Sequence, residues 1–181
     1  MAWIAKVFSQ GEVFREVILI FLTIGSWHRG FDRLVKAVDE LKGQGVITED
    51  VYAQIGDGTY KPINLETRTY YSSVEFVKII SQARIVIAHA GMGTIIEATR
   101  QGKPIVVVPR QADLGEANTD HQFDTAEVLE REGKILVARE TGDLPVKLKE
   151  AEDFIPTQGK DSGQVLNAVQ AFIDSVIANR R

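Results

Sequence analysis

The sequence predicts a single α/β domain built on a doubly wound, mostly parallel sheet. Apolar runs of strand length alternate along the chain with stretches whose apolar residues recur at helical spacing. Two of the runs, residues 85–88 and 105–108, are apolar throughout, which is typical of strands buried on both faces. A chain of 181 residues is long enough for one such core. We therefore expect one domain over residues 17–181, preceded by an N-terminal arm over residues 1–16.

The first strand and helix are clear at the start of this domain. Residues 17–24 are apolar on both faces and have the length of one strand. A glycine-bounded loop over residues 25–30 follows. Residues 31–41 then place apolar side chains on one helical face, and Gly43 and Gly45 are expected to end that helix.

The later elements rest on the same patterns, with serine and glycine at the expected helix ends. In order, they are a strand over 51–56, a turn over 56–58, a short strand over 67–71, a helix from a cap at Ser73 to about Gln82, a strand over 85–88, a helix over 94–101, a strand over 105–108, a helix over 118–132 ending at Gly133, a short strand over 135–138, and helices over 143–151 and 164–178.

Composition and charge exclude several classes of protein. The apolar content of 44% and the charged content of 25% are those of an ordinary globular protein. A net charge of -4 gives no basic footprint, so nucleic acid is not an expected partner. The absence of cysteine excludes disulfides, cysteine-ligated zinc and a thiol nucleophile. No apolar run has the length of a transmembrane helix and no signal peptide is expected, so we expect a cytoplasmic protein.

The most informative segment lies between the two fully apolar strands, at residues 89–97. His89 can donate a hydrogen bond to a diphosphate, and Thr94 adds a hydroxyl. Glu97, one turn into the following helix, can accept two hydrogen bonds from a ribose diol. Four residues are expected to point backbone N–H groups outward at a helix N-terminus, which favours negative charge: Gly91, Met92, Gly93 and Thr94. The segment therefore offers groups for the diphosphate and the ribose of a nucleotide-sugar.

Each of these residues also has a purely structural explanation. Two glycines can make a tight strand-to-helix turn, His89 can be a buried histidine bonded to a backbone carbonyl, and Glu97 can be a helix former near the positive end of the dipole. The combination favours binding, because a histidine, two glycines, a hydroxyl and an acid all fall between residues 89 and 97, at the carboxyl end of a strand.

This segment resembles the nucleotide-sugar signature of GT-B glycosyltransferases, which have two Rossmann-like domains. Residues 19–34 resemble the opening strand, glycine loop and helix of glycosyltransferase family 28, and residues 109–122 resemble the loop that reaches the donor sugar. The three motifs occur in order over about residues 17–133, as in stand-alone family 28 C-terminal domains. That group includes catalytic subunits of two-subunit dolichol-pathway N-acetylglucosaminyltransferases and subunits of bacterial exopolysaccharide galactosyl- or glucosyltransferases. The implied fold is the C-terminal half of a GT-B enzyme.

The resemblance implies further contacts with the donor. Gly25 and Ser26 would line the diphosphate from the start of the next helix, although a plain strand-to-helix turn is the alternative. Arg110 would neutralise phosphate or fix its loop, and an exposed loop arginine is the alternative. After this loop, Asp120 and Gln122 would bind sugar hydroxyls, and capping of the following helix by Asn118 and Asp120 is the alternative. The implied donor residues in these two regions are Gly25, Ser26, Arg110, Asp120, His121 and Gln122.

The predicted function is that of the UDP-sugar-binding subunit of a split glycosyltransferase, which transfers a hexose or N-acetylhexosamine to a lipid-linked or saccharide acceptor. In GT-B enzymes the catalytic base comes from the N-terminal domain, which this chain is expected to lack. A membrane-attached partner subunit is therefore expected to bring the acceptor and the base, with His28 and His121 as weaker candidates for the base. The isolated chain is expected to expose apolar surface beside its glycine loops and to self-associate. We expect no cofactor and no metal, because GT-B enzymes generally use none and the three histidines have no metal-ligand spacing.

Two other functions remain open. One is a non-catalytic nucleotide-binding or regulatory module, and the other is a GT-B-like nucleotide-sugar epimerase, which normally needs both Rossmann-like domains in one chain. A dehydrogenase is disfavoured because residues 25–30 contain no GxGxxG. In the arm, one helical stripe is expected to pack on this domain or on a second copy. Its residues are Trp3, Ile4, Val7 and Phe8.

Overall fold

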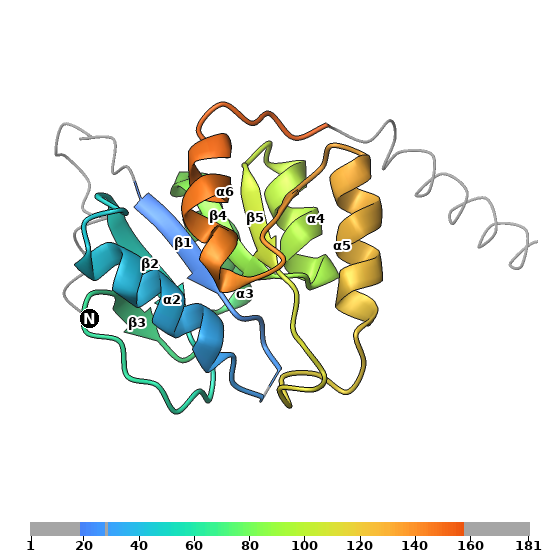
Figure 1. The fold of residues 1–181 in the computed structure, drawn as a ribbon. Helices are drawn as coiled ribbons and strands as arrows, with labels where there is room; N and C mark the ends of the chain where they lie inside the picture. The colour runs from blue at the N-terminus through green and yellow to red at the C-terminus, as the bar shows by residue number, and fades with distance from the viewer. Residues whose placement is uncertain (1–18, 28, 158–181) are drawn as a thin grey trace, which may run out of the picture.

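One parallel sheet organises the structure, which is a computed structural model that describes residues 19–27 and 29–157 (Figure 1). The N-terminal arm, His28 and the helix expected over 164–178 lie outside the described residues. Six strands pair in the order β3-β2-β1-β4-β5-β6, and every pair is parallel. The strands are β1 (Leu19–Thr23), β2 (Asp50–Gln54), β3 (Glu66–Arg68), β4 (Ala83–His89), β5 (Ile105–Val108) and β6 (Leu136–Val137).

Helices cover both faces of this sheet. Helices α2 and α6 lie on one face, and α3, α4 and α5 lie on the other (Figure 1). The predicted doubly wound α/β fold is therefore confirmed. The helices are α2 (Asp32–Gly43), α3 (Ser73–Gln82), α4 (Met92–Arg100), α5 (His121–Arg131) and α6 (Leu144–Glu150), with a short 3-10 helix η1 (Thr141–Asp143) before α6.

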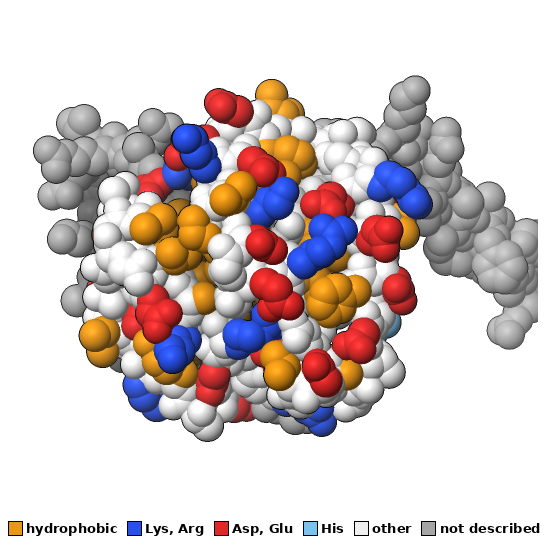
Figure 2. Space-filling view, in the orientation of Figure 1, with side chains coloured by type: hydrophobic (Ala, Val, Ile, Leu, Met, Phe, Trp, Pro, Cys, Tyr) orange, Lys and Arg blue, Asp and Glu red, His pale blue; other side chains and the backbone are white. Residues whose placement is uncertain are grey.

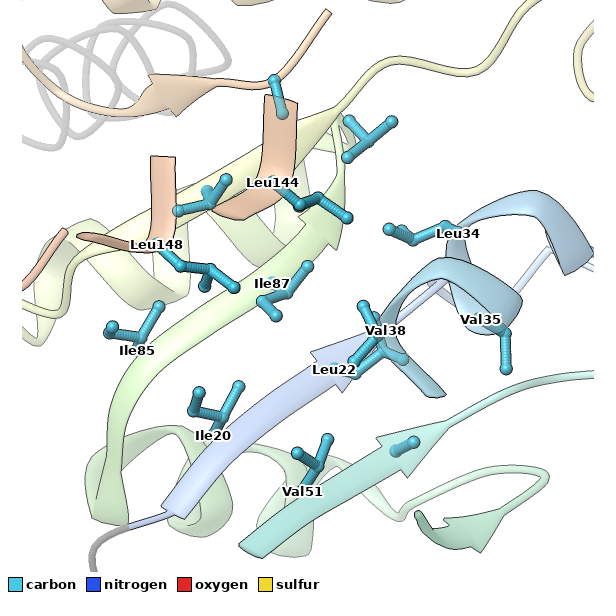
Figure 3. Packing of buried hydrophobic residues seen from close by; sticks show 14 of the residues in the cluster. Ile20, Leu22, Leu34, Val35, Val38, Val51, Ile85, Ile87, Leu144 and Leu148 are labelled. Carbon is cyan, nitrogen blue, oxygen red and sulfur yellow. The ribbon is translucent and has the colours of Figure 1, made fainter. Parts of the chain in front are cut away.

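Alternation along β1 divides the core into two halves. Ile20 and Leu22 point to the face that α2 and α6 cover, as Figure 3 shows. Leu19 and Phe21 point to the opposite face, where they pack with side chains of α3, α4 and α5. All four side chains are almost fully buried. Because burial of one such side chain contributes about 1.5–3 kcal/mol, the apolar run at the start of the domain anchors both layers.

Every predicted helix start within the described residues is displaced by one to three residues; α4 begins at Met92 and not at residue 94, and α6 at Leu144 and not at residue 143. The N-cap of α3 is Ser72 rather than Ser73, because Ser72 and Glu75 form a capping box in which each side chain accepts from the other's backbone N–H. Helix α2 begins at Asp32, one residue later than predicted, because Phe31 is its N-cap and directly follows the glycine loop. Helix α5 begins at His121 and not at residue 118, since Asp120 uses its carboxylate to accept from the backbone N–H of Ala112 instead of capping the helix.

The helix ends agree better with the glycine pattern. Gly45 and Gly133 both have positive φ angles, of 76° and 67°, and each lies just after a helix. Such angles favour glycine because other residues meet a steric penalty there.

The surface of this molecule mixes charges. Figure 2 shows Lys and Arg side chains interspersed with Asp and Glu over the face that α2 and α6 cover. No helix in the described part of the chain is long and apolar enough to cross a membrane.

Candidate functional site

A pocket opens at the carboxyl ends of β1 and β4, the two strands between which the strand order reverses. Ligands of open parallel sheets bind at such switch points. The pocket has a volume of about 410 Å³. Its lining consists of Gly25, Ser26, Gln54, Tyr70, Tyr71, Ser73, Phe76, Val77, His89, Gly91, Gly93, Thr94 and Glu97. The structure therefore brings together the predicted residues of the first glycine loop and of the 89–97 segment. Met92 is 47% exposed and stands outside this lining.

His89 ends β4 and packs against two glycines. A Cβ atom on Gly25 would fall 2.5 Å from the imidazole Cε1, and one on Gly91 would fall 2.0 Å from Nε2. Gly25 also has a φ of 83°, which other residues rarely adopt. Both glycines are thus required for the imidazole to lie where it does.

The imidazole of His89 is neutral at physiological pH. Burial lowers its pKa to about 4, and the nearby positive charge of Arg110 acts in the same direction, while a hydrogen bond with the Thr23 backbone opposes them. Its Nδ1 has no well-formed hydrogen bond within the described residues. A neutral imidazole carries one N–H donor, so His89 can offer a hydrogen bond to a phosphate oxygen but no positive charge.

The N-terminus of α4 forms one wall of the pocket. Gly91 is the N-cap, and no side chain caps the helix. The N–H groups of the first turn have no intrahelical acceptor, which leaves those of Met92, Gly93 and Thr94 available for an anion. The expectation that Gly91 also points its N–H outward was wrong, because that group donates to the carbonyl oxygen of His89 at 2.8 Å.

Glu97 presents its carboxylate to the pocket from α4. The side chain is 16% exposed and accepts from Nη2 of Arg100 at 2.6 Å and from Nε2 of Gln101. Burial alone would raise the pKa of Glu97, but these hydrogen bonds outweigh it and lower the pKa. The carboxylate is therefore ionised and can accept from a ligand hydroxyl at neutral pH.

The opposite wall was missed from the sequence. Tyr70 and Tyr71 follow β3, Phe76 belongs to α3, and all three line the pocket. Gln54, at the carboxyl end of β2, joins the walls: its Nε2 donates to the carbonyl oxygen of Gly25 at 2.9 Å, and its Oε1 accepts from the N–H of Tyr71 at 3.1 Å. A glutamine at the end of an otherwise apolar run, residues 51–54, was the signal that the sequence offered for this residue.

Arg110 does not reach the pocket. It is fully buried, and its guanidinium donates to the carbonyl oxygens of Ile24, Gly30 and Glu116. Of the roles expected for it, this position agrees with fixing the loop and not with direct contact to phosphate. The alternative of an exposed loop arginine was also wrong.

The residues after this loop also lie outside the pocket lining. Gln122 is 8% exposed and accepts the backbone N–H of Arg110 at 3.1 Å. His121 is exposed, and its Nδ1 lies 2.7 Å from the hydroxyl of Thr119. With Asp120 bound to the backbone of Ala112, these side chains hold the β5–α5 loop together. Their predicted contact with the sugar stays a prediction.

The sequence of this chain matches a known protein family. The sequence profile of the glycosyltransferase family 28 C-terminal domain matches residues 19–171. This chain belongs to that family. Within the described residues, this family 28 domain has no group of three His, Cys, Asp or Glu side chains placed to hold a metal ion.

Curated relatives of this family 28 domain carry the name UDP-N-acetylglucosamine transferase subunit ALG13. The protein from Mus musculus is 32% identical over 126 residues, which are 64% of this chain and 10% of the mouse protein. The protein from Cryptococcus neoformans is 32% identical over 88 residues, which are 48% of this chain and 42% of the fungal protein. The chain therefore spans less than half the length of these relatives.

Solved structures share the fold. The NMR solution structure of ALG13 superposes with a TM-score of 0.55 at 15% identity, over 84% of this chain and 94% of that one. The calicheamicin glycosyltransferase CalG4 superposes with a TM-score of 0.57 at 18% identity, over 77% of this chain and 35% of that one. The domain thus has the fold of one part of a GT-B glycosyltransferase.

Proposed function

We propose that this family 28 domain is the UDP-sugar-binding subunit of a split glycosyltransferase. With a partner subunit it transfers a hexose or N-acetylhexosamine to a lipid-linked or saccharide acceptor. The observation that carries the proposal is the pocket at the switch point, where His89, the start of α4 and Glu97 face an aromatic wall. Its relatives are named as subunits of a UDP-N-acetylglucosamine transferase, which supports the same donor class.

The diphosphate would lie against His89 and the start of α4. As the bond between the sugar and the diphosphate breaks, negative charge grows on the leaving phosphate oxygens. The N–H groups of Met92, Gly93 and Thr94, together with the imidazole N–H, are already oriented and stabilise that charge without reorganising. These donors supply the stabilisation with no metal ion in the proposed mechanism.

The nucleoside would occupy the rest of the pocket. The ionised carboxylate of Glu97 accepts a charge-assisted hydrogen bond from each of the two ribose hydroxyls. The rings of Tyr70, Tyr71 and Phe76 line the pocket and offer apolar surface for a base. Gln54 holds this surface at a fixed distance from the glycine loop.

The acceptor needs a base that the described pocket lining does not offer. An acceptor hydroxyl loses its proton to a positioned base during transfer. With a pKa of about 4, His89 is a weak proton acceptor, and the Glu97 carboxylate is held by Arg100 and Gln101. We therefore assign the base and the acceptor site to a membrane-attached partner, which would place the reaction at the cytoplasmic face of the membrane.

Calorimetry of the full chain tests the donor site directly. We expect UDP to bind weakly, and ADP and NAD to bind less well, because the pocket combines diphosphate and ribose contacts with a compact aromatic wall. Equal or tighter binding of NAD would overturn the proposal. Binding of all three nucleotides with equal affinity would favour a general nucleotide-binding module instead.

A further inference from the structure

Arg110 is a buried arginine that forms no ion pair within the described part of the chain. Its exposure is 0%, and it lies two residues after the end of β5. Nη1 donates to the carbonyl oxygens of Gly30 at 2.8 Å and Glu116 at 3.2 Å, and Nη2 donates to that of Ile24 at 3.0 Å. Across residues 19–27 and 29–157, no carboxylate forms an ion pair with it. Since an unpaired buried charge costs folding free energy, its presence calls for a functional reason.

The acid beside Arg110 is engaged by another arginine. Both carboxylate oxygens of Glu116 accept from Arg33, each at 2.9 Å. The guanidinium carbon of Arg110 lies 4.7 Å from the ring centre of Phe31 and 5.7 Å from that of Trp27. The direct contacts of Arg110 are therefore carbonyl oxygens and ring faces, which carry no full negative charge, and the charge of Glu116 acts on it without an ion pair.

This charge lies behind the proposed diphosphate site. Ile24, which accepts from Arg110, directly precedes Gly25, and Gly25 packs against the imidazole of His89. The field of Arg110 reaches that imidazole, because it is one of the causes that lower the pKa of His89. A charge in the interior acts over such distances because it is screened less than a charge at the surface.

We propose that Arg110 is a positioning residue of the donor site: it ties the β1–α2 loop to the β5–α5 loop and holds a positive charge behind the diphosphate without touching it. This inference rests on the proposed function, since an anionic ligand is what gains from such a charge. Burial lowers the pKa of Arg110 to about 10, so the guanidinium keeps its charge at neutral pH. Binding of a diphosphate then offsets part of the cost of burying that charge.

The test compares UDP with uridine, which has the same nucleoside and no phosphate. Arg110→Gln removes the charge and keeps an N–H₂ donor for the carbonyls, whereas Arg110→Lys keeps the charge. We expect Arg110→Gln to weaken UDP binding roughly tenfold and uridine binding by less than about twofold. Arg110→Lys should keep the ratio of the two affinities within about threefold of the wild-type ratio. Ligand-observed NMR gives both dissociation constants.

Arg84→Gln is the control, because Arg84 pairs with Glu49 outside the donor pocket lining and is not among the causes of the His89 shift. It should leave the ratio of UDP to uridine affinity unchanged. An NMR titration should show the pKa of His89 raised in Arg110→Gln and unchanged in Arg84→Gln. Equal losses of UDP and uridine binding in Arg110→Gln, or no loss at all, would overturn the inference.

A measurement on the wild type covers the case in which Arg110→Gln does not fold. The Cζ resonance of Arg110 must then shift when UDP is added and stay in place when uridine is added; a resonance that responds to neither, or equally to both, contradicts the inference. If the wild type binds no UDP at all, the proposed function fails, and this inference fails with it.

Discussion

The imidazole of His89 shows what a single side chain contributes to this site. Glycines at positions 25 and 91 could be predicted from sequence as turn formers. That both lie against the same imidazole could not, because the contact joins the ends of β1 and β4, which are distant in the sequence and adjacent in the sheet. Local patterns hold no information on such a contact.

Arg110 shows the same limit of prediction from local sequence patterns. The resemblance of its loop to that of family 28 implied a role at the donor site, but the choice between contacting phosphate and fixing a loop depends on burial. The guanidinium donates to three carbonyl oxygens from two loops, and these contacts show that Arg110 fixes the loops. Only the tertiary fold brings those carbonyls to Arg110, so the sequence could not show them.

Glu97 carries a prediction at the residue scale. Glu97→Gln removes the charge from both expected hydrogen bonds to the ribose, and charge-assisted hydrogen bonds of this kind contribute about 1.5–3 kcal/mol. We expect UDP binding to weaken roughly ten- to hundredfold. Calorimetry measures the change, and 2′-deoxy-UDP should bind the wild type poorly for the same reason.

Glu127→Gln is the control for this variant, because Glu127 is an exposed acid on α5 and not part of the pocket lining. It should bind UDP as the wild type does. If Glu97→Gln also binds UDP as the wild type does, Glu97 serves only to pair with Arg100 on the helix surface.

The start of α3 shows how far the sequence determines an element. The periodicity of residues 73–82 predicted the helix and its end correctly, but two adjacent serines could each cap it. Glu75 decides between them, since a capping box requires an acid or amide three residues after the cap. That signal was present in the sequence. The aromatic wall was not predictable in this way, because Tyr70 and Tyr71 gain their role from the position of β3 beside β2.

A pair of serine variants tests the cap. Ser72→Ala removes the side chain that accepts from the N–H of Glu75, and should lower the free energy of unfolding by about 1 kcal/mol. Ser73→Ala changes an exposed side chain in the first turn and should change it by less than about 0.5 kcal/mol. Urea denaturation of both variants gives the comparison; equal losses would mean that Ser72 is not the cap that stabilises α3.

At the scale of the whole molecule, the alternation of strands and helices predicted a parallel sheet with helices on both faces. The order β3-β2-β1-β4-β5-β6 is a property of strand pairing, and it alone determines that β1 and β4 meet and open the pocket between them. Of the exposed apolar side chains of α3 and α4, Val77 lines the pocket and Met92 lies between Gly91 and Gly93, which line it. The expected apolar surface beside the glycine loops and the self-association of the isolated chain stay predictions.

Dependence on a partner is the prediction that belongs to this scale. If the partner supplies the base, as proposed, the chain alone leaves one side of the donor pocket open to water and positions no base against an acceptor hydroxyl. A positioned base contributes about 10²- to 10⁴-fold to the rate, and its loss adds to the loss of an enclosed site. The purified chain should therefore transfer sugar from a UDP-sugar at least about a hundredfold more slowly than the chain with its cognate partner.

Radiolabelled sugar transfer to membranes measures this with the chain alone, the partner alone and both together. Glu97→Gln added to the wild-type partner is the internal control: it should lower transfer, which shows that the restored activity uses the donor site of this chain. If the partner gives the same rate of sugar transfer with Glu97→Gln as with the wild-type chain, the donor site lies elsewhere. Robust turnover by the chain alone would place the base within this sequence, and His28 and His121, the candidates for the base named from the sequence, would then be substituted first.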